Sequence, residues 1–209
     1  MVDITAQRRR VRRSRAGGAR LVVDAAVRVL VRDGLDGLSV RKVALEAHVS
    51  VGAIQHHYAT KDALLVASAE HITSQFMRRA EEVSQQAFAR EGGFAAFAAF
   101  CELLANASPT ESSSGDDVTP SIVWLWYAAK ATQPGFVADT FARFWSGTEE
   151  YLMGAIIELF PSLDAADEAA HLLAVLDGIA IARAAEPGRM SLSRAQMLVR
   201  RHLDCLSRR

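Results

Sequence analysis

The 209-residue sequence has only two cysteines, Cys101 and Cys205, which lie far apart in apolar stretches. So few cysteines exclude a disulfide framework and a zinc-binding cysteine motif. No run approaches the roughly 18 consecutive apolar residues of a membrane-spanning helix. The arginine-rich N-terminal stretch is not followed by the apolar segment of a secretory signal. We therefore expect a cytoplasmic protein with reduced thiols and no membrane segment.

Catalytic and cofactor-binding motifs are also missing. The sequence contains no Gly-x-Ser-x-Gly, no phosphate-binding loop and no His-Glu-x-x-His. The adjacent His56 and His57 do not form a metal pair, because consecutive residues do not face the same side of a helix. The sequence predicts no enzyme, no cofactor and no metal.

Strand patterns are absent, and helical periodicity runs through nearly everything after residue 18. Hydrophobic residues make up 50% of the chain and mean hydropathy is +0.09, enough for a full core with apolar surface left for a partner or cavity. We predict an all-α fold of about nine helices. Gly34 should close the first of them in a left-handed conformation. The expected helices are 19–33, two short ones within 39–58, then 60–88, 94–107, 120–132, 135–160, 165–186 and 191–206, with a loop at 108–117.

Positive and negative residues balance over the whole chain, but they are distributed unevenly along the sequence. Residues 1–62 hold 12 Lys/Arg and 6 Asp/Glu, whereas residues 63–209 hold 12 and 18. A basic N-terminal third indicates a surface that meets polyphosphate. Residues 1–18, rich in arginine, are predicted to be a disordered arm. That arm could enter a minor groove, add salt-dependent affinity or have little role.

Residues 39–58 have the pattern of a helix-turn-helix. Ser39 and Ser50 can each cap a short helix, and residues 47–49 form a tight corner between the two. Small side chains at Ala44 and Ala47 allow the two helices to cross closely. The alternative is a helical hairpin in an ordinary bundle, which the basic N-terminal third makes less favourable.

The outward face of the second short helix carries slim or hydrogen-bonding side chains that fit a major groove. Gln55 can read adenine, and Ala53 or Val51 can contact a thymine methyl group. The predicted DNA-binding residues are Ser39, Arg41, Lys42, Ser50, Val51, Gly52, Ala53, Gln55, His56, His57 and Lys61. Among them Ser39, Arg41, Lys42, His57 and Lys61 are the candidates for phosphate contacts.

The N-terminal residues carry a specific resemblance over about 48 residues. The segments are Arg20-Leu-Val-Val-Asp-Ala-Ala-Val-Arg-Val-Leu, Asp33-Gly34, Ser39-Val40, Val43-Ala44, Val49-Ser50-Val-Gly52 and Tyr58-Ala-Thr-Lys61-Asp-Ala-Leu-Leu65. They are similar to the N-terminal signature of the TetR family. Gln55 stands where the family usually has Tyr, so the family's aromatic phosphate contact is not transferred. Tyr58 replaces the commoner Phe.

The resemblance implies a DNA-binding domain at 19–62 and an effector-binding and dimerisation domain at 63–209. It implies a homodimer through helices 165–186 and 191–206, and the C-terminal part looks like the BetI-like subset. Dimerisation fits operators because two recognition helices about 34 Å apart match successive major grooves. Seven residues offer more apolar surface than the core of one subunit needs, although packing within one subunit is the alternative. They are Leu172, Leu173, Leu176, Ile179, Ala180, Leu198 and Leu203.

Aromatic residues gather on the helices that would enclose an effector. The predicted effector-binding residues are Phe76, Phe97, Phe100, Trp124, Tyr127, Phe141, Phe144, Trp145 and Asp177. Any single aromatic is more often simple core, but the set favours a large apolar or aromatic effector. Polar anchors besides Asp177 could be Glu102, Glu149, His171 or Arg183, and a cationic effector is conceivable through cation–π attraction.

We therefore predict a ligand-responsive regulator that binds double-stranded DNA. Repression of a palindromic operator, relieved by the effector, is the commoner behaviour of similar proteins. The long helix starting at Thr60 should link the cavity to the DNA-binding helices. The alternative is an effector-independent or architectural DNA-binding protein.

Overall fold

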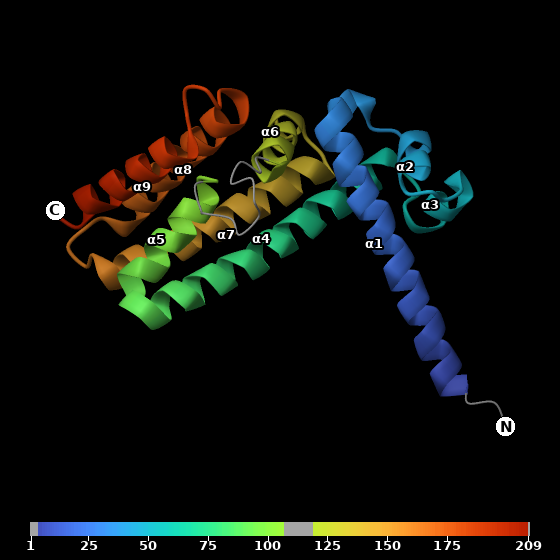
Figure 1. The fold of residues 1–209 in the computed structure, drawn as a ribbon, viewed down its shortest axis with the longest axis horizontal. Helices are drawn as coiled ribbons and strands as arrows, with labels where there is room; N and C mark the ends of the chain where they lie inside the picture. The colour runs from blue at the N-terminus through green and yellow to red at the C-terminus, as the bar shows by residue number, and fades with distance from the viewer. Residues whose placement is uncertain (1–3, 107–118, 209) are drawn as a thin grey trace.

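The computed structural model describes residues 4–106 and 119–208, and within them the chain is all-α with nine helices and no strand, as predicted (Figure 1). The predicted loop at 108–117 lies outside the described residues. No helix in the described ranges is long and apolar enough to cross a membrane. The helices are α1 (Ile4–Gly37), α2 (Val40–Glu46), α3 (Val51–His57), α4 (Lys61–Glu91), α5 (Gly93–Leu104), α6 (Thr119–Ala131), α7 (Phe136–Leu159), α8 (Ala165–Ala185) and α9 (Leu192–Leu206).

The first helix is longer than predicted. We expected residues 1–18 to be disordered, but α1 begins at Ile4 and projects from the rest of the molecule (Figure 1). Arginine and alanine are good helix formers, no proline interrupts the stretch, and the packed part of α1 supplies the helical nucleus. Gly34 has φ +70°, so the expected left-handed break is confirmed, and the chain continues for one further turn to Gly37.

Side-chain caps fix the start of the next three helices. The hydroxyl oxygens of Ser39, Ser50 and Thr60 accept hydrogen bonds from the backbone N–H groups three residues further on, at 3.3, 3.1 and 3.0 Å. Each cap satisfies an N–H group that would otherwise lack a helical partner. These three predicted starts are confirmed, and they set the α2–turn–α3 geometry.

Two separate clusters form the interior. The head core joins α1, α2, α3 and the first turns of α4 with one face of α6 and the start of α7. The rear core joins α5, α8 and α9 with the later turns of α4 and α7. The head core therefore does not end at residue 62, where we predicted the domain boundary, because Leu64, Val123, Tyr127 and Val137 belong to it.

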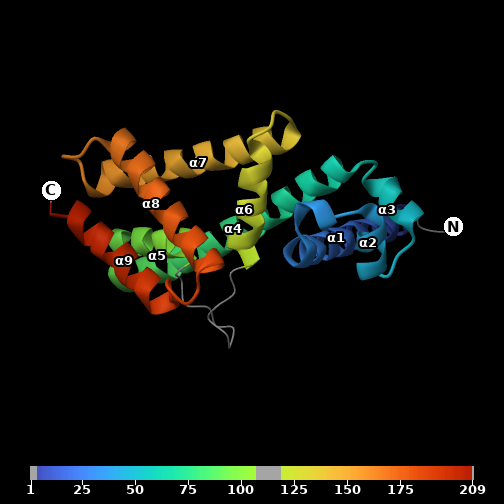
Figure 2. The same cartoon turned by 90° about the horizontal axis from the view of Figure 1, so that it is seen from above.

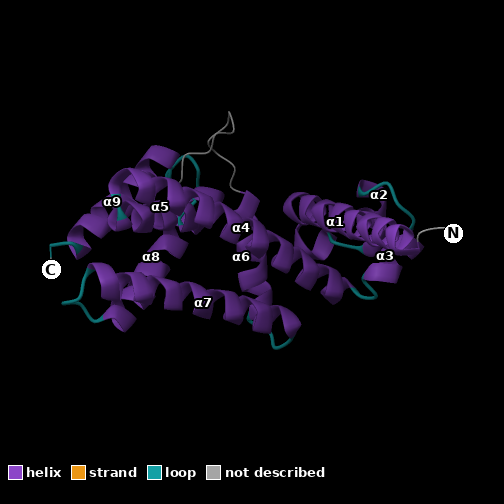
Figure 3. Cartoon of the chain, turned by 90° about the horizontal axis from the view of Figure 1, so that it is seen from below, coloured by secondary structure: helices purple, strands orange, loops and turns teal. Residues whose placement is uncertain are grey.

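Helix α6 lies crosswise between α4 and α7, where the C-terminal helices meet the first three (Figures 2 and 3). It contacts α1, α7 and α8. Val123 on α6 is completely buried in the head core. The α6 helix thus belongs to the C-terminal part of the sequence but packs with the helices of the head core.

The leucine-rich faces of α8 and α9 are buried within the single chain. Six of the seven residues that we predicted as surplus apolar surface are buried within one subunit, and Leu198 is half-buried. That prediction was wrong because α8 turns this face toward α5 and α7. The exposed strip of α8 instead carries small residues, among them Ala170, Ala174 and Gly178.

Candidate DNA-binding surface and effector cavity

Helix α3 presents its polar and slim side chains to solvent. Ile54 is completely buried in the head core and anchors the helix from behind. All predicted base-reading residues of this helix are exposed: Val51, Gly52, Ala53, Gln55, His56 and, next to them, His57. The exposed face is free of long charged side chains, so backbone and short groups can approach base edges in a major groove.

The corner between α2 and α3 is held by backbone hydrogen bonds. The Val49 N–H donates to the Ala44 carbonyl at 3.0 Å and the His48 N–H to the Leu45 carbonyl at 3.2 Å. This pattern requires a left-handed residue after the helix cap, and His48 takes that position with φ +54°. The sequence analysis missed this role because a histidine there replaces the usual glycine.

The predicted phosphate-contacting residues differ in their surroundings. Lys42 Nζ lies 2.8 Å from Asp33 Oδ2, and Lys61 Nζ donates to the Leu35 carbonyl at 2.6 Å. These two lysines therefore fasten α2 and α4 to the end of α1. Arg41 is exposed and forms no ion pair within the described part of the chain.

An ion-pair network holds α2 against α1. Glu46 pairs with Arg28 at 2.8 Å and with Arg32 at 2.9 Å. Arg32 also lies 2.9 Å from Asp33. Hydrogen bonds from Arg28 and then Arg32 lower the pKa of Glu46, and those from Arg32 and then Lys42 lower the pKa of Asp33. The network orients the helix-turn-helix but lies in solvent, where each pair contributes little to stability.

Four of the predicted effector-binding residues line one cavity between α6, α7 and α8. The aromatic cavity, as we name it, has a volume of about 90 Å³, and its walls include Trp124, Phe141, Trp145 and Asp177. The Trp124 ring stacks on Phe144 with centroids 4.5 Å apart and on Trp145 at 5.7 Å. Trp124 and Trp145 line the cavity themselves, whereas Phe144 packs behind Trp124.

The remaining predicted aromatics lie elsewhere. Phe100 and Phe144 line a groove of about 230 Å³ between α4 and α7, and Phe76 lines a separate pocket beside α1. Phe97 packs against Phe160 in the rear core, and Tyr127 is buried in the head core, so neither lines a cavity described here. The helices therefore carry these rings to different faces, and the cavities of the described residues are each lined by only part of the predicted set.

Asp177 is the predicted polar anchor that lines the aromatic cavity. No hydrogen bond or ion pair satisfies its carboxylate within the described residues, and burial raises its pKa to about 6. The other candidate anchors are used differently or lie outside this cavity. Glu102 accepts a hydrogen bond from Arg200 at 2.8 Å, Glu149 and His171 are exposed, and Arg183 is buried.

Helix α6 connects this cavity to the head. The Trp126 ring packs over the backbone of Gly34, where a Cβ atom added to the glycine would meet ring carbon Cζ2 at 3.1 Å. The Tyr127 hydroxyl donates to the Leu65 carbonyl at 2.6 Å, which ties α6 to α4, and burial raises the pKa of that hydroxyl. Sequence reasoning missed Trp126 because nothing within α6 indicates that its neighbour is a glycine 92 positions earlier.

The all-α fold, the capped α2–turn–α3 unit and its exposed face define a helix-turn-helix transcriptional regulator. Two family descriptions match the chain: "Bacterial regulatory proteins, tetR family" over residues 22–68 and "BetI-type transcriptional repressor, C-terminal" over residues 105–208. The chain belongs to the TetR family, and its C-terminal part is of the BetI type. It is a DNA-binding regulator and not an enzyme.

Several characterised and solved proteins are similar along most of the chain. The regulator PksA of Bacillus subtilis is 22% identical over 195 residues, which cover 88% of this chain and 87% of PksA. The regulator BetI of Burkholderia thailandensis is 25% identical over 185 residues, covering 88% and 91%. A transcriptional regulator of Rhodococcus sp. Rha1 superposes with a TM-score of 0.77 at 24% identity, covering 90% and 95%. This structural likeness shows that the fold is shared.

Proposed function

We propose that the protein is a ligand-responsive repressor. In this proposal a homodimer binds a palindromic operator and leaves it when a small, largely apolar or aromatic effector enters the aromatic cavity. The observation that carries the proposal is the position of α6, which provides Trp124 to the cavity and Val123 to the head core. One helix therefore contacts both the ligand site and the DNA-binding helices.

In this proposal α3 enters the major groove with Gln55 and the short side chains around it. Arg41 contacts phosphate, since it is exposed and not held by an acidic partner in the described ranges. Ser39 and Ser50 direct the helix N-termini, whose N–H groups favour phosphate. Lys42 and Lys61 contribute positive charge near the surface while they hold the head together.

The dimer is proposed to form through α8 and α9. Its contacts differ from the leucines of the prediction, most of which are buried within one subunit. Ile181 and Met197 are 45% and 57% exposed in the single chain. On α8, nearer its N-terminus than Ile181, Ala170, Ala174 and Gly178 recur at helical spacing and are also exposed. Small residues at such spacing allow two α8 helices to approach closely, with the larger apolar side chains closing the edges.

The effector is proposed to carry a positive charge beside its aromatic or apolar body. A partnerless carboxylate among aromatic rings is the environment in which a cation is stabilised by both charge and cation–π attraction. A neutral effector would cover the half-buried Asp177 carboxylate without compensating its charge.

The size of the cavity suggests how binding of the effector is coupled to release of the operator. Its 90 Å³ is well below the roughly 300 Å³ of sites for drug-sized ligands, so the stacked rings must part to admit an effector of that size. Parting Trp124 from Phe144 displaces α6 relative to α7. Because Trp126 packs over Gly34, the displacement reaches α1 and shifts the equilibrium between two head positions.

Operator selection followed by ligand release tests this function. Duplexes enriched from a random pool by the purified protein should contain a palindrome, and footprinting should map it. Benzyltrimethylammonium should then release the operator, whereas its uncharged carbon analogue neopentylbenzene should act much more weakly. Trp124→Ala should reduce the response at least tenfold without altering ligand-free operator affinity, and Phe136→Ala, at an exposed aromatic of α7, is the control. Footprints unchanged across a library of cations and neutral aromatics would indicate an effector-independent regulator instead.

A further inference from the structure

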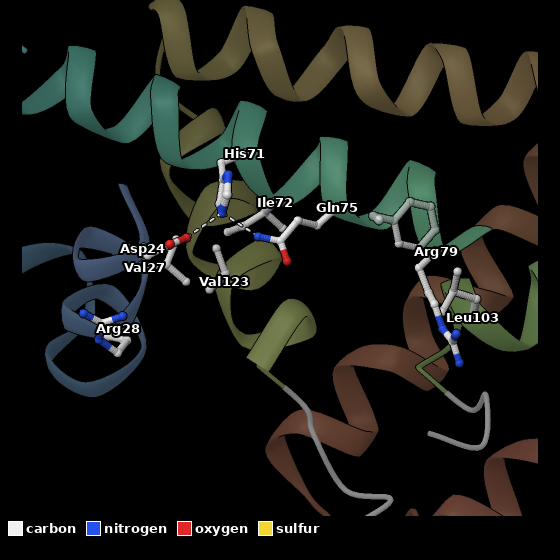
Figure 4. A pocket seen from close by; sticks show the side chains of 10 residues that line it. Asp24, Val27, Arg28, His71, Ile72, Gln75, Arg79, Leu103 and Val123 are labelled. Carbon is white, nitrogen blue, oxygen red and sulfur yellow. Dashed lines mark hydrogen bonds and ion pairs between the residues drawn. The ribbon is translucent and has the colours of Figure 1, made fainter. Parts of the chain in front are cut away.

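A second pocket lies where the head meets the C-terminal helices. The junction pocket, as we name it, has a volume of about 430 Å³ and is bounded by α1, α4, the end of α5 and α6 (Figure 4). Val123 borders it, whereas Trp124 borders the aromatic cavity, so the two cavities lie on different faces of α6. The volume lies within the range of small-molecule sites.

One end of the junction pocket is polar and already satisfied. His71 Nε2 lies 2.7 Å from Asp24 Oδ1 and also contacts the side-chain amide of Gln75, as Figure 4 shows. Arg28, on the same side, is paired with Glu46 at 2.8 Å. Asp24 and His71 therefore bind each other across the α1–α4 boundary, and Arg28 is held by Glu46 on α2, so this end already has partners for its polar groups.

The other end carries a guanidinium whose hydrogen-bonding capacity is largely unused. Arg79 lies two turns after His71 on α4, about 12 Å along the helix. The single ion pair seen for it in the described ranges joins its Nη1 to Glu82 Oε2 at 3.6 Å, longer than a hydrogen bond. A guanidinium has five N–H donors in a planar fork that matches a carboxylate.

The wall between the two ends is mainly apolar. Ile72 and Phe76 contribute from α4, Leu103 from α5 and Val123 from α6 (Figure 4). A ligand that fills this pocket must therefore have an apolar body of about the length of two helical turns. Its charged group should be an anion, since the charged side chain at the second of these ends, Arg79, is cationic and its ion pair with Glu82 is too long for a hydrogen bond.

We propose that the junction pocket binds an amphipathic monocarboxylate, with the carboxylate on Arg79 and the apolar body against Ile72, Leu103 and Val123. This site is separate from the aromatic cavity and takes a ligand of opposite charge. The proposal therefore goes beyond the effector response proposed above and does not depend on it.

Calorimetric titration of the full-length protein with decanoate, kept below its micelle concentration, tests the proposal. Decanoate should bind, and decyltrimethylammonium, with the same chain and the opposite charge, should bind at least tenfold more weakly. Arg79→Gln should weaken decanoate at least tenfold, while Arg79→Lys, which keeps the positive charge, should retain most of the affinity.

Arg78→Gln provides the matched control, because Arg78 lies beside Arg79 on α4 and pairs with the same Glu82, at 3.2 Å, but does not line this pocket. It should change decanoate affinity less than twofold, and thermal melts of both glutamine variants should coincide. Decanoate binding that is absent, equal in Arg79→Gln and wild type, or lost equally in Arg78→Gln would overturn the proposal. So would a cationic amphiphile that binds as tightly as decanoate.

Discussion

The head core and the rear core differ in the part of the sequence that builds them: the first holds buried residues from Val22 to Val137, and the second from Ala80 to Leu206. The head core draws on α1, α2, α3, α4, α6 and α7, whereas the rear core is built from α5, α8 and α9 with the later turns of α4 and α7. Helices α4 and α7 are shared between them, but the buried face of α6 belongs to the head. The difference teaches that the DNA-binding helices share their core with residues of α6 and α7, from the C-terminal part of the sequence.

The proposed effector site lies where these two cores meet. Trp124 and Phe141 pack against the head core, whereas Phe76, in contact with Phe144 at 5.9 Å, packs against the rear core. In the proposal, an effector that separates Trp124 and Phe141 from Phe76 and Phe144 changes the position of one core relative to the other. The proposed coupling therefore requires no chain of intermediate residues, since α6 itself borders the cavity and contributes to the head core.

The largest expected effects come from cavities made in either core. Leu30→Ala in the head core and Leu172→Ala in the rear core remove completely buried side chains, and each should cost about 2–5 kcal/mol in urea unfolding. The two variants are then compared by the tryptophan fluorescence of their folded states. Leu30→Ala should alter it, because α6 packs on the head core, and Leu172→Ala should alter it less. Equal fluorescence changes would mean that α6 is not part of the head.

Loss of a base contact should have the next largest effect. Gln55→Ala should cost about 1–3 kcal/mol at each half-site and relax base preference there. Arg41→Gln is the comparison, because losing a phosphate contact weakens all duplexes alike and lowers the salt slope by about 0.9 per contact. Fluorescence anisotropy on operator and scrambled duplexes between 50 and 200 mM salt distinguishes the two. If both variants relaxed base preference equally, the assignment of these contacts would be wrong.

Protonation of Asp177 should change cation affinity by a smaller factor. With its pKa raised to about 6, the carboxylate is mostly ionised at pH 7 and mostly protonated at pH 5, so affinity for benzyltrimethylammonium should fall about tenfold. A pKa raised on folding also means that the ligand-free fold loses stability as pH rises through 6. Asp177→Asn should abolish both pH dependences. A cation affinity that stays constant from pH 5 to 7 would remove Asp177 from the site.

The smallest expected effect is at the corner of the helix-turn-helix. His48 has φ +54°, where a side chain costs about 1 kcal/mol relative to glycine. His48→Gly should therefore stabilise the protein by up to that amount, with Ala47→Gly, at a residue of ordinary helical φ, as a destabilising control. Chemical denaturation measures both, and a destabilised His48→Gly variant would contradict the strain at this corner.

The sequence predicted the features that depend on residues three or four apart. The caps at Ser39, Ser50 and Thr60, the break at Gly34 and the exposed face of α3 all belong to this class. Each depends on local backbone geometry and the alternation of apolar and polar positions. The BetI-like character of the C-terminal part was also recognisable from its residues.

Features that depend on how distant helices cross could not be predicted. Whether Leu172 faces its own subunit or a partner depends on where α5 and α7 lie. Trp124 and Phe97 look alike in the sequence, yet one borders a cavity and the other packs in the core. The lysine at position 61 was assigned to phosphate because its partner, the Leu35 carbonyl, becomes available only where α1 ends.

Native-state hydrogen exchange tests most directly whether α6 belongs with the DNA-binding helices. Under increasing denaturant, amides of α6 around Val123 and Tyr127 should open with the same free energy and the same denaturant dependence as those of α1 to α3. Amides of α8 and α9 should open with a different free energy and a different denaturant dependence. If α6 instead opened together with α8 and α9 while the first three helices opened separately, the account of coupling through α6 would be contradicted.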